Sequence, residues 1–397
     1  MRADGSFAAT FPEPGGASVL KVHYLPASQL QGLLTGPTMT VREKLLAVYR
    51  GQPGDRLPNV EFGYWALTLE RWHACGLPPD VCTDARAELH FGLEGITIFE
   101  ELPVRDGLHP AFDRRVLSQQ ADRQVIIDEE GNTCEVLSDT SSMPKYLRYG
   151  LQSREDWARL RSERLDPLHP GRVGDVPAML RRAAGSGLPS FFHAGSLYGW
   201  LRNWMGVEGI SIALMADRGW IEEMMEHLTG LTLSLIERAV PAQGVDLAWW
   251  WEDMCYNRGP LMSPKLFADL MVPRYRRITD ALRAHGIEIN VLDCDGRIHE
   301  LVPGWLEAGI NCMFPLEAAH TDPFQLRREH PDVLLLGAVD KRALIAGPKA
   351  IDAEIARLRP LVDQGRFIPC VDHRVPPDVT YDNYRYYLDA KQKLLEP

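Results

Sequence analysis

Acidic residues recur at the ends of short apolar segments, and their closest spacing lies in INVLDCDGRIHE, residues 289–300. Asp293 and Asp295 are two residues apart, so an extended chain turns both carboxylates to one side and Cys294 into packing on the other. Two adjacent carboxylates can transfer protons or bind a divalent cation. His373 follows another apolar segment late in the chain, and imidazole can serve either chemistry.

Other apolar segments also end in polar residues. Glu252 and Asp253 follow three consecutive tryptophans. Because a strand turns alternate side chains to opposite faces, only one of these acids can face a site, and Glu252 is the one we predict. The candidate catalytic residues are Glu252, Asp293, Asp295 and His373, and the candidate metal ligands are Asp293, Asp295 and His373. The candidates for substrate binding are Glu61, Trp65, His193 and Glu317.

Each candidate also has a purely structural interpretation. Asp295 precedes Gly296, and an aspartate there often shapes a turn or caps the next helix. His373 could be a buried histidine bonded to a backbone carbonyl. Trp65, like other tryptophans, belongs to a core more often than to a binding site. The functional interpretation therefore predicts that the candidates converge on one cavity.

The apolar segments that carry these residues indicate a parallel sheet. They are continuously apolar, as strands buried on both faces are, and helical segments follow them. In a (β/α)8 barrel the C-terminal ends of the strands share one mouth and supply the catalytic groups. We predict a (β/α)8 TIM barrel over residues 41–397, with strands within residues 188–194, 245–253, 287–295, 310–317, 333–340 and 365–373.

Further segments fit this interpretation. Residues 57–64 predict a first strand that carries Glu61, and residues 123–138 predict a β-hairpin inserted outside the barrel. Helical spacing of apolar residues predicts helices over residues 42–52, 217–240 and 263–286. A doubly wound open sheet is the alternative fold. It is disfavoured because the sequence has no GxGxxG after a strand and no GxxxxGK[ST].

Composition excludes several classes of protein. The 397 residues carry a formal net charge of −11, which disfavours nucleic-acid and anionic-membrane partners. The seven cysteines include no CxxC pair, so neither a disulfide framework nor a thiolate zinc site is expected. The sequence has no apolar run of about 18 residues, and residues 1–40 predict a flexible leader rather than a signal peptide. We expect a cytoplasmic protein that forms a homodimer.

Several stretches together resemble the superfamily of uroporphyrinogen decarboxylase and the cobalamin-dependent methyltransferases. The resemblance covers residues 40–395 and implies a (β/α)8 barrel. It rests on REKLLAVYRGQPGDRLPNVE, GPLMSPKLFADLMVPRYRRITDALRAHG, LVPGWLEAGINCMFPLE, LLLGAVDKRALIAGPKAI and VDHRVPPDVTYDNYRYY.

The sequence departs from two patterns of that superfamily, and these departures limit which of its activities the chain is expected to have. Decarboxylases carry a basic RxxxR-type segment that holds the tetrapyrrole carboxylates, but here the matching stretch begins with Glu61, and its first basic residue is Arg71. Zinc-dependent methyltransferases carry His-x-Cys-Gly where this chain has Asp293-Cys294-Asp295-Gly296, and a late Cys where it has His373. The resemblance therefore implies a divalent ion, zinc first, bound by oxygen and nitrogen.

The resemblance leaves two activities open. The first, which we favour, is methyl transfer from a small methylated substrate to a corrinoid on a partner protein, with acid or metal activation of the leaving group. The alternative is a carboxy-lyase that protonates a carbanion without a metal. A barrel used only as a binding module is disfavoured, because so many strands end in polar residues.

Overall fold

The computed structural model describes residues 39–52, 56–137 and 144–396. The predicted leader, residues 1–40, thus lies almost entirely outside the described residues. Among those described, every helix is too short or too polar to cross a membrane.

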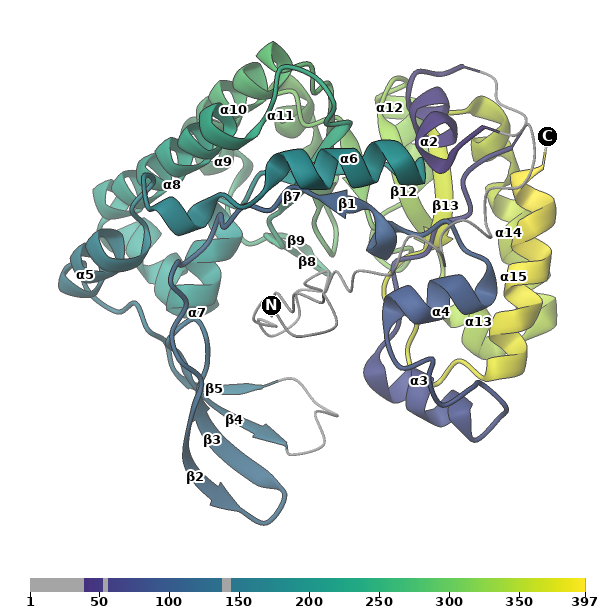
Figure 1. Ribbon diagram of the computed structural model, residues 1–397, viewed down its shortest axis with the longest axis horizontal. Helices are drawn as coiled ribbons and strands as arrows, with labels where there is room; N and C mark the ends of the chain where they lie inside the picture. The colour runs from purple at the N-terminus through teal and green to yellow at the C-terminus, as the bar shows by residue number, and fades with distance from the viewer. Residues whose placement is uncertain (1–38, 53–55, 138–143, 397) are drawn as a thin grey trace.

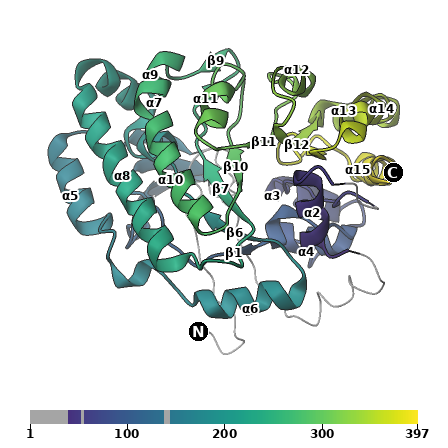
Figure 2. The same cartoon turned by 90° about the horizontal axis from the view of Figure 1, so that it is seen from above.

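A seven-stranded parallel sheet forms the centre of the molecule, and helices pack around its outer side (Figures 1 and 2). Each apolar segment predicted to be a strand between residues 188 and 373 contributes one strand. The sheet is curled like that of a TIM barrel. In spatial order its strands are β1 (Glu100–Glu101), β6 (Ser190–His193), β7 (Leu247–Trp251), β10 (Ile289–Asp293), β11 (Cys312–Phe314), β12 (Leu334–Val339) and β13 (Phe367–Val371).

Alternate side chains of these strands pack in two separate clusters. On β7, Leu247 and Trp249 belong to the inner cluster, whereas Ala248 and Trp250 pack against the helices. The same alternation on β10 places Ile289 inside. The strands are therefore buried on both faces, which explains their continuously apolar sequences.

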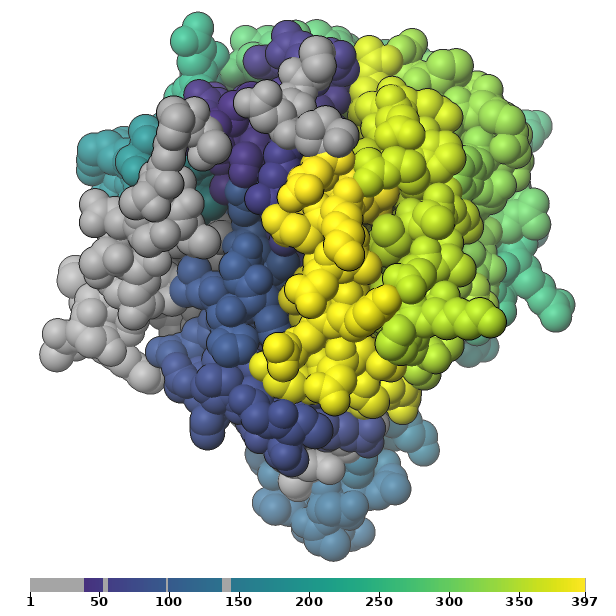
Figure 3. Space-filling model, turned by 90° about the vertical axis from the view of Figure 1, so that its right-hand side faces the viewer, coloured from purple at the N-terminus to yellow at the C-terminus, as the bar shows by residue number. Residues whose placement is uncertain are grey.

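The predicted strand over residues 57–64 is not a strand of this sheet. A single parallel bridge joins Tyr64 to Val375. The reason lies partly in Glu61, whose carboxylate accepts the Val371 N–H that a strand pairing could have used. Figure 3 shows this N-terminal part packed against the C-terminal part, and the Leu57 N–H donates to the Leu395 carbonyl. The two ends of the fold therefore meet without a continuous pairing of strands.

A second sheet projects from the body (Figure 1). It is antiparallel, and its two middle strands form a hairpin over residues 123–137, where a hairpin was predicted. The outer strands escaped prediction, because residues 115–120 are all exposed and show no burial pattern. The four strands are β2 (Arg115–Gln120), β3 (Arg123–Ile127), β4 (Thr133–Leu137) and β5 (Lys145–Arg148).

Helices form where the apolar spacing predicts them, with one interruption. The predicted helix over residues 263–286 breaks at Met271, because Pro273 lies in the first turn of a new helix. The helices are α2 (Val41–Tyr49), α3 (Ala66–His73), α4 (Asp84–Phe91), α5 (Arg154–Arg164), α6 (Val176–Ser186), α7 (Tyr198–Ala216), α8 (Arg218–Ala239), α9 (Pro264–Leu270), α10 (Val272–Ala284), α11 (Val302–Glu307), α12 (Pro323–Glu329), α13 (Lys341–Ala346), α14 (Pro348–Gln364) and α15 (Tyr381–Leu395).

A buried glutamate in α4 makes the stability depend on pH. Burial, together with the nearby charge of Asp84, raises the pKa of Glu88 to about 8 from an ordinary 4.5, although Thr97 bonds oppose the rise. The folded protein therefore keeps this proton where the unfolded chain has lost it, so stability falls as pH rises from about 4.5 to about 8. Glu88→Gln, neutral at every pH, is expected to raise the free energy of unfolding near pH 8 by a few kcal/mol.

Urea unfolding curves near pH 5 and near pH 8 measure this effect. The increase in the free energy of unfolding caused by Glu88→Gln is expected to be several times larger at the higher pH. If the free energies of unfolding of Glu88→Gln and the wild type differed equally at both pH values, the raised pKa of Glu88 would be contradicted.

Candidate active site

Three aspartates meet at the C-terminal ends of β7 and β10. One carboxylate oxygen from each of Asp253, Asp293 and Asp295 lies within 4.8 Å of the others, and we call this set the acidic cluster. Trp251 and Asp293 are register partners in the parallel pair, so the chain two residues beyond each runs side by side. The Asp295 N–H donates to the Asp253 carboxylate at 3.2 Å, which holds the two loops together.

His373 joins the cluster from the end of β13. Its Nε2 lies 3.5 Å from the Asp295 carboxylate, and its ring stacks on Trp65 with centroids 6.2 Å apart. Burial opposes a charge on His373, but the hydrogen bond and charge of Asp295 outweigh it and raise its pKa. Asp295 thus favours the charged form of His373, which would partly balance the aspartates. Asp293, Asp295 and His373 come together as the sequence predicted.

The acidic cluster carries more negative charge than its cations offset. Burial, and then the charges of Asp253 and Asp295, raise the pKa of Asp293 well above its usual range. Burial and the charge of Asp295 raise the pKa of Asp253 to about 6, against the opposing Arg202. A guanidinium nitrogen of Arg202 lies 3.3 Å from the Asp253 carboxylate. The cluster therefore favours the binding of a proton or of a further cation.

The side chain of Asp253, and not that of Glu252, faces the inner side of the curled sheet. Ala248 and Trp250 face the helices, and Glu252 continues that side of the chain. Its buried carboxylate accepts hydrogen bonds at 2.7–3.1 Å from the Ser196 and Tyr275 hydroxyls and from the N–H groups of Leu197, Tyr198 and Gly199. Glu252 thus anchors the start of α7. The prediction that Glu252 faces the site is therefore wrong, and Asp253 takes that position.

Glu61 is also a structural residue. Its fully buried carboxylate lies 2.7 Å from the Lys391 ammonium and accepts from the Tyr387 hydroxyl at 2.7 Å. Both partners belong to α15, so the side chain turns to the helix layer and away from the acidic cluster. The prediction that Glu61 binds substrate is therefore not supported.

Two further predicted residues border the acidic cluster, and a third pairs elsewhere. Trp65 is 38% exposed beside His373. Glu317 accepts the N–H of Gly296, which directly follows Asp295, at 2.9 Å, and it pairs with Lys341 at 3.1 Å. His193 pairs instead with Asp106, at 2.8 Å.

The donors of the acidic cluster fit a divalent ion. Ligand oxygens at about 2.0–2.2 Å from one zinc ion lie at most about 4.4 Å apart, close to the spacing seen here. Asp253, Asp293 and Asp295 would hold such an ion, while His373 contacts the group through Asp295. The three groups close enough to share one ion are Asp253, Asp293 and Asp295, so Asp253 takes the place that was predicted for His373.

Comparison with known proteins agrees with the fold. The family model for Uroporphyrinogen decarboxylase (URO-D) matches residues 129–394. The chain belongs to this family. Among 26 matching chains of solved structure, a methyltransferase from Methanosarcina mazei shares 16% sequence identity, with a TM-score of 0.57 over 89% of this chain and 99% of that one. At this identity the likeness establishes the fold alone. No curated protein matches the sequence.

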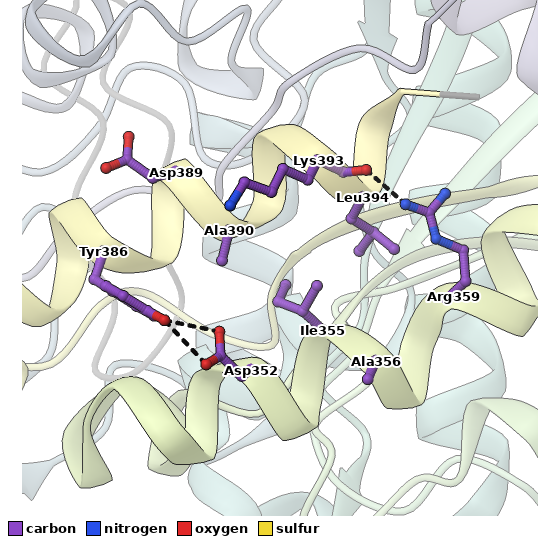
Figure 4. A pocket seen from close by; sticks show the side chains of 9 residues that line it. All are labelled: Asp352, Ile355, Ala356, Arg359, Tyr386, Asp389, Ala390, Lys393 and Leu394. Carbon is purple, nitrogen blue, oxygen red and sulfur yellow. Dashed lines mark hydrogen bonds between the residues drawn. The ribbon is translucent and has the colours of Figure 1, made fainter.

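This URO-D family member also has a groove on its outer surface, between α14 and α15 (Figure 4). Its volume is about 530 Å³. The Tyr386 hydroxyl donates to the Asp352 carboxylate at 3.0 Å, so part of its polar rim is already paired. None of the lining residues belongs to the acidic cluster. They are Asp352, Ile355, Ala356, Arg359, Tyr386, Asp389, Ala390, Lys393 and Leu394.

Proposed function

We propose that this chain is a methyltransferase that takes a methyl group from an oxygen or nitrogen atom of a small substrate. The acceptor would be a corrinoid carried on a partner protein. The observation that carries the proposal is the acidic cluster with His373 at the C-terminal ends of the strands, where barrels of this type place their chemistry. The fold likeness to a methyltransferase supports it.

The leaving atom needs stabilisation when its bond to the methyl carbon breaks. A proton or a cation can supply it. Asp293 is positioned for this role, because its carboxyl lies beside Asp253 and Asp295, and burial with those charges raises its pKa well above the usual range. A divalent ion, when bound by these aspartates, would supply Lewis-acid activation of the same atom. Trp65 presents an exposed aromatic face beside His373 that suits a methylated group.

The charge of the site favours neutral or cationic substrates. Three carboxylates face Arg202 and His373, so a multiply anionic porphyrinogen would meet repulsion where it needs arginine pairs. Aryl methyl ethers and methylated amines meet no such barrier. The family name and the raised pKa of Asp293 favour the alternative, a carboxy-lyase in which this acid protonates a carbanion.

A spectroscopic assay distinguishes these functions. Purified protein is mixed with cob(I)alamin, in place of the partner protein, and with methyl ethers or methylated amines. Methylcobalamin is expected to form with one of the two classes, and elemental analysis of the same preparation is expected to find zinc. Release of CO2 from carboxylic acids, without any methylcobalamin, would establish the lyase instead.

A further inference from the structure

A second group of polar residues lies at the C-terminal ends of β1 and β6. Phe99 and Phe191 belong to the inner cluster of the sheet. Glu101 and His193 follow each of them by two residues, so both side chains turn to the same inner side. Strand β6 pairs directly with β7, which leads into Asp253. The second group therefore stands at the same end of the sheet as the acidic cluster.

Trp249 lies between the two groups. It is the register partner of His193 in the pair of β6 and β7. On its other side, its side chain lies near Asp293 and opposes the rise in the pKa of that carboxyl. One indole thus separates His193 from the acidic cluster, and a substrate bound above Trp249 could reach both.

The contacts of His193 fix how its ring is oriented. Nδ1 lies 2.8 Å from the Asp106 carboxylate, and the two side chains are 21% and 9% exposed. The N–H of Gly195 also lies 3.3 Å from Nδ1, but the shorter, charged contact indicates that Nδ1 carries a hydrogen and donates it to Asp106. Nε2 makes no hydrogen bond to the described residues. It is the nitrogen left for a ligand.

The charges around His193 favour its protonated form. Burial alone would lower the pKa of His193, but Asp106 and then Glu101 outweigh it and raise the pKa. Burial and the charge of Asp106 raise the pKa of Glu101 to about 7, although His193 and Arg105 oppose this. Together with His193, Arg172 helps to lower the pKa of Asp106. A donor works best when its pKa lies near the working pH, and the ordinary pKa of histidine is already close to neutral.

We propose that His193, oriented by Asp106, is the proton donor to the leaving group, and that Glu101 restores its proton. As the bond from the methyl carbon to oxygen or nitrogen breaks, its electron pair stays on the leaving atom, which takes the proton from Nε2. The methyl carbon bonds to the nucleophilic Co(I) of the corrinoid substrate. The neutral imidazole then regains a proton from solvent through Glu101. This inference rests on the proposed methyl transfer and separates proton donation from the acidic cluster.

The test compares leaving groups in His193→Ala. Methyl ethers of weakly acidic phenols need a proton as they leave, whereas 4-nitroanisole and tetramethylammonium release stable groups without one. His193→Ala is expected to lower kcat by about 10²–10⁴-fold for the first kind of substrate and by less than tenfold for the second. Added imidazole is expected to restore part of the lost rate. Asp106→Asn is expected to give the same pattern with a smaller loss.

His227→Gln serves as the matched control, because His227 is a half-buried histidine bonded to the Leu165 carbonyl, outside this group. It is expected to keep the wild-type rates. If His193→Ala does not fold, His193→Gln replaces it in the same series. Equal losses on both kinds of substrate, with no rescue by imidazole, would overturn the role of His193. Absence of methylcobalamin with wild-type protein would instead reject the proposed function itself.

Discussion

Asp293→Asn is expected to lower the rate of methyl transfer by about 10²–10³-fold while the protein stays folded. The amide keeps the shape of the side chain but does not bind an ion as a carboxylate does. The change also removes one of three like groups that lie within 4.8 Å, so stability is expected not to fall. Steady-state rates, thermal unfolding and elemental analysis measure the three quantities together.

Asp322→Asn is a suitable control for this experiment. Asp322 caps α12 and lies outside the acidic cluster, so its replacement is expected to leave rate and metal content unchanged. If the cluster binds an ion, metal content should fall together with the rate in Asp293→Asn. A folded Asp293→Asn protein with the full wild-type rate would remove the acidic cluster from the mechanism.

Glu252→Ala is expected to lower the free energy of unfolding by about 3–5 kcal/mol. The reason is that five donors around one buried carboxylate would lose their acceptor at once. Glu252→Gln is the matched variant, because it keeps one acceptor oxygen, and it is expected to lose clearly less stability. Urea unfolding curves measure both.

The rate of Glu252→Gln separates anchoring from catalysis. Since this carboxylate faces α7 and not the acidic cluster, the variant is expected to keep a rate within about tenfold of the wild type. A loss of 100-fold or more in a stable Glu252→Gln protein would return Glu252 to the catalytic residues.

The strands and part of the site could be predicted from the sequence because each depends on local patterns. Continuously apolar runs indicated strands buried on both faces, and acids at their ends indicated one shared edge. The choice between Glu252 and Asp253 had no such signal. The preceding residues, Trp249, Trp250 and Trp251, are all apolar, so the sequence does not reveal which of them face inward. The register between β7 and β10 decides which acid faces inward, and this register is known only from the folded sheet.

Other features depend on residues that are distant in the sequence. Glu61 looked like a site residue at a strand end, but its partner Lys391 comes 330 residues later. Arg202 and Asp106 reach Asp253 and His193 from a helix and a loop that carry no recognisable motif. Buried ion pairs of this kind arise from tertiary packing, which spacing along the chain does not report.

The adjacency of Glu252 and Asp253 bears on how this barrel can evolve. Glu252 holds α7 to the sheet, whereas Asp253 contributes to the acidic cluster, so a substitution at one leaves the task of the other intact. Asp253 has a φ of 44°, a conformation that asparagine and glycine also accept readily. A lineage could therefore exchange the ligand or acid at this position in a single mutational step and acquire a new reaction before any change in the scaffold.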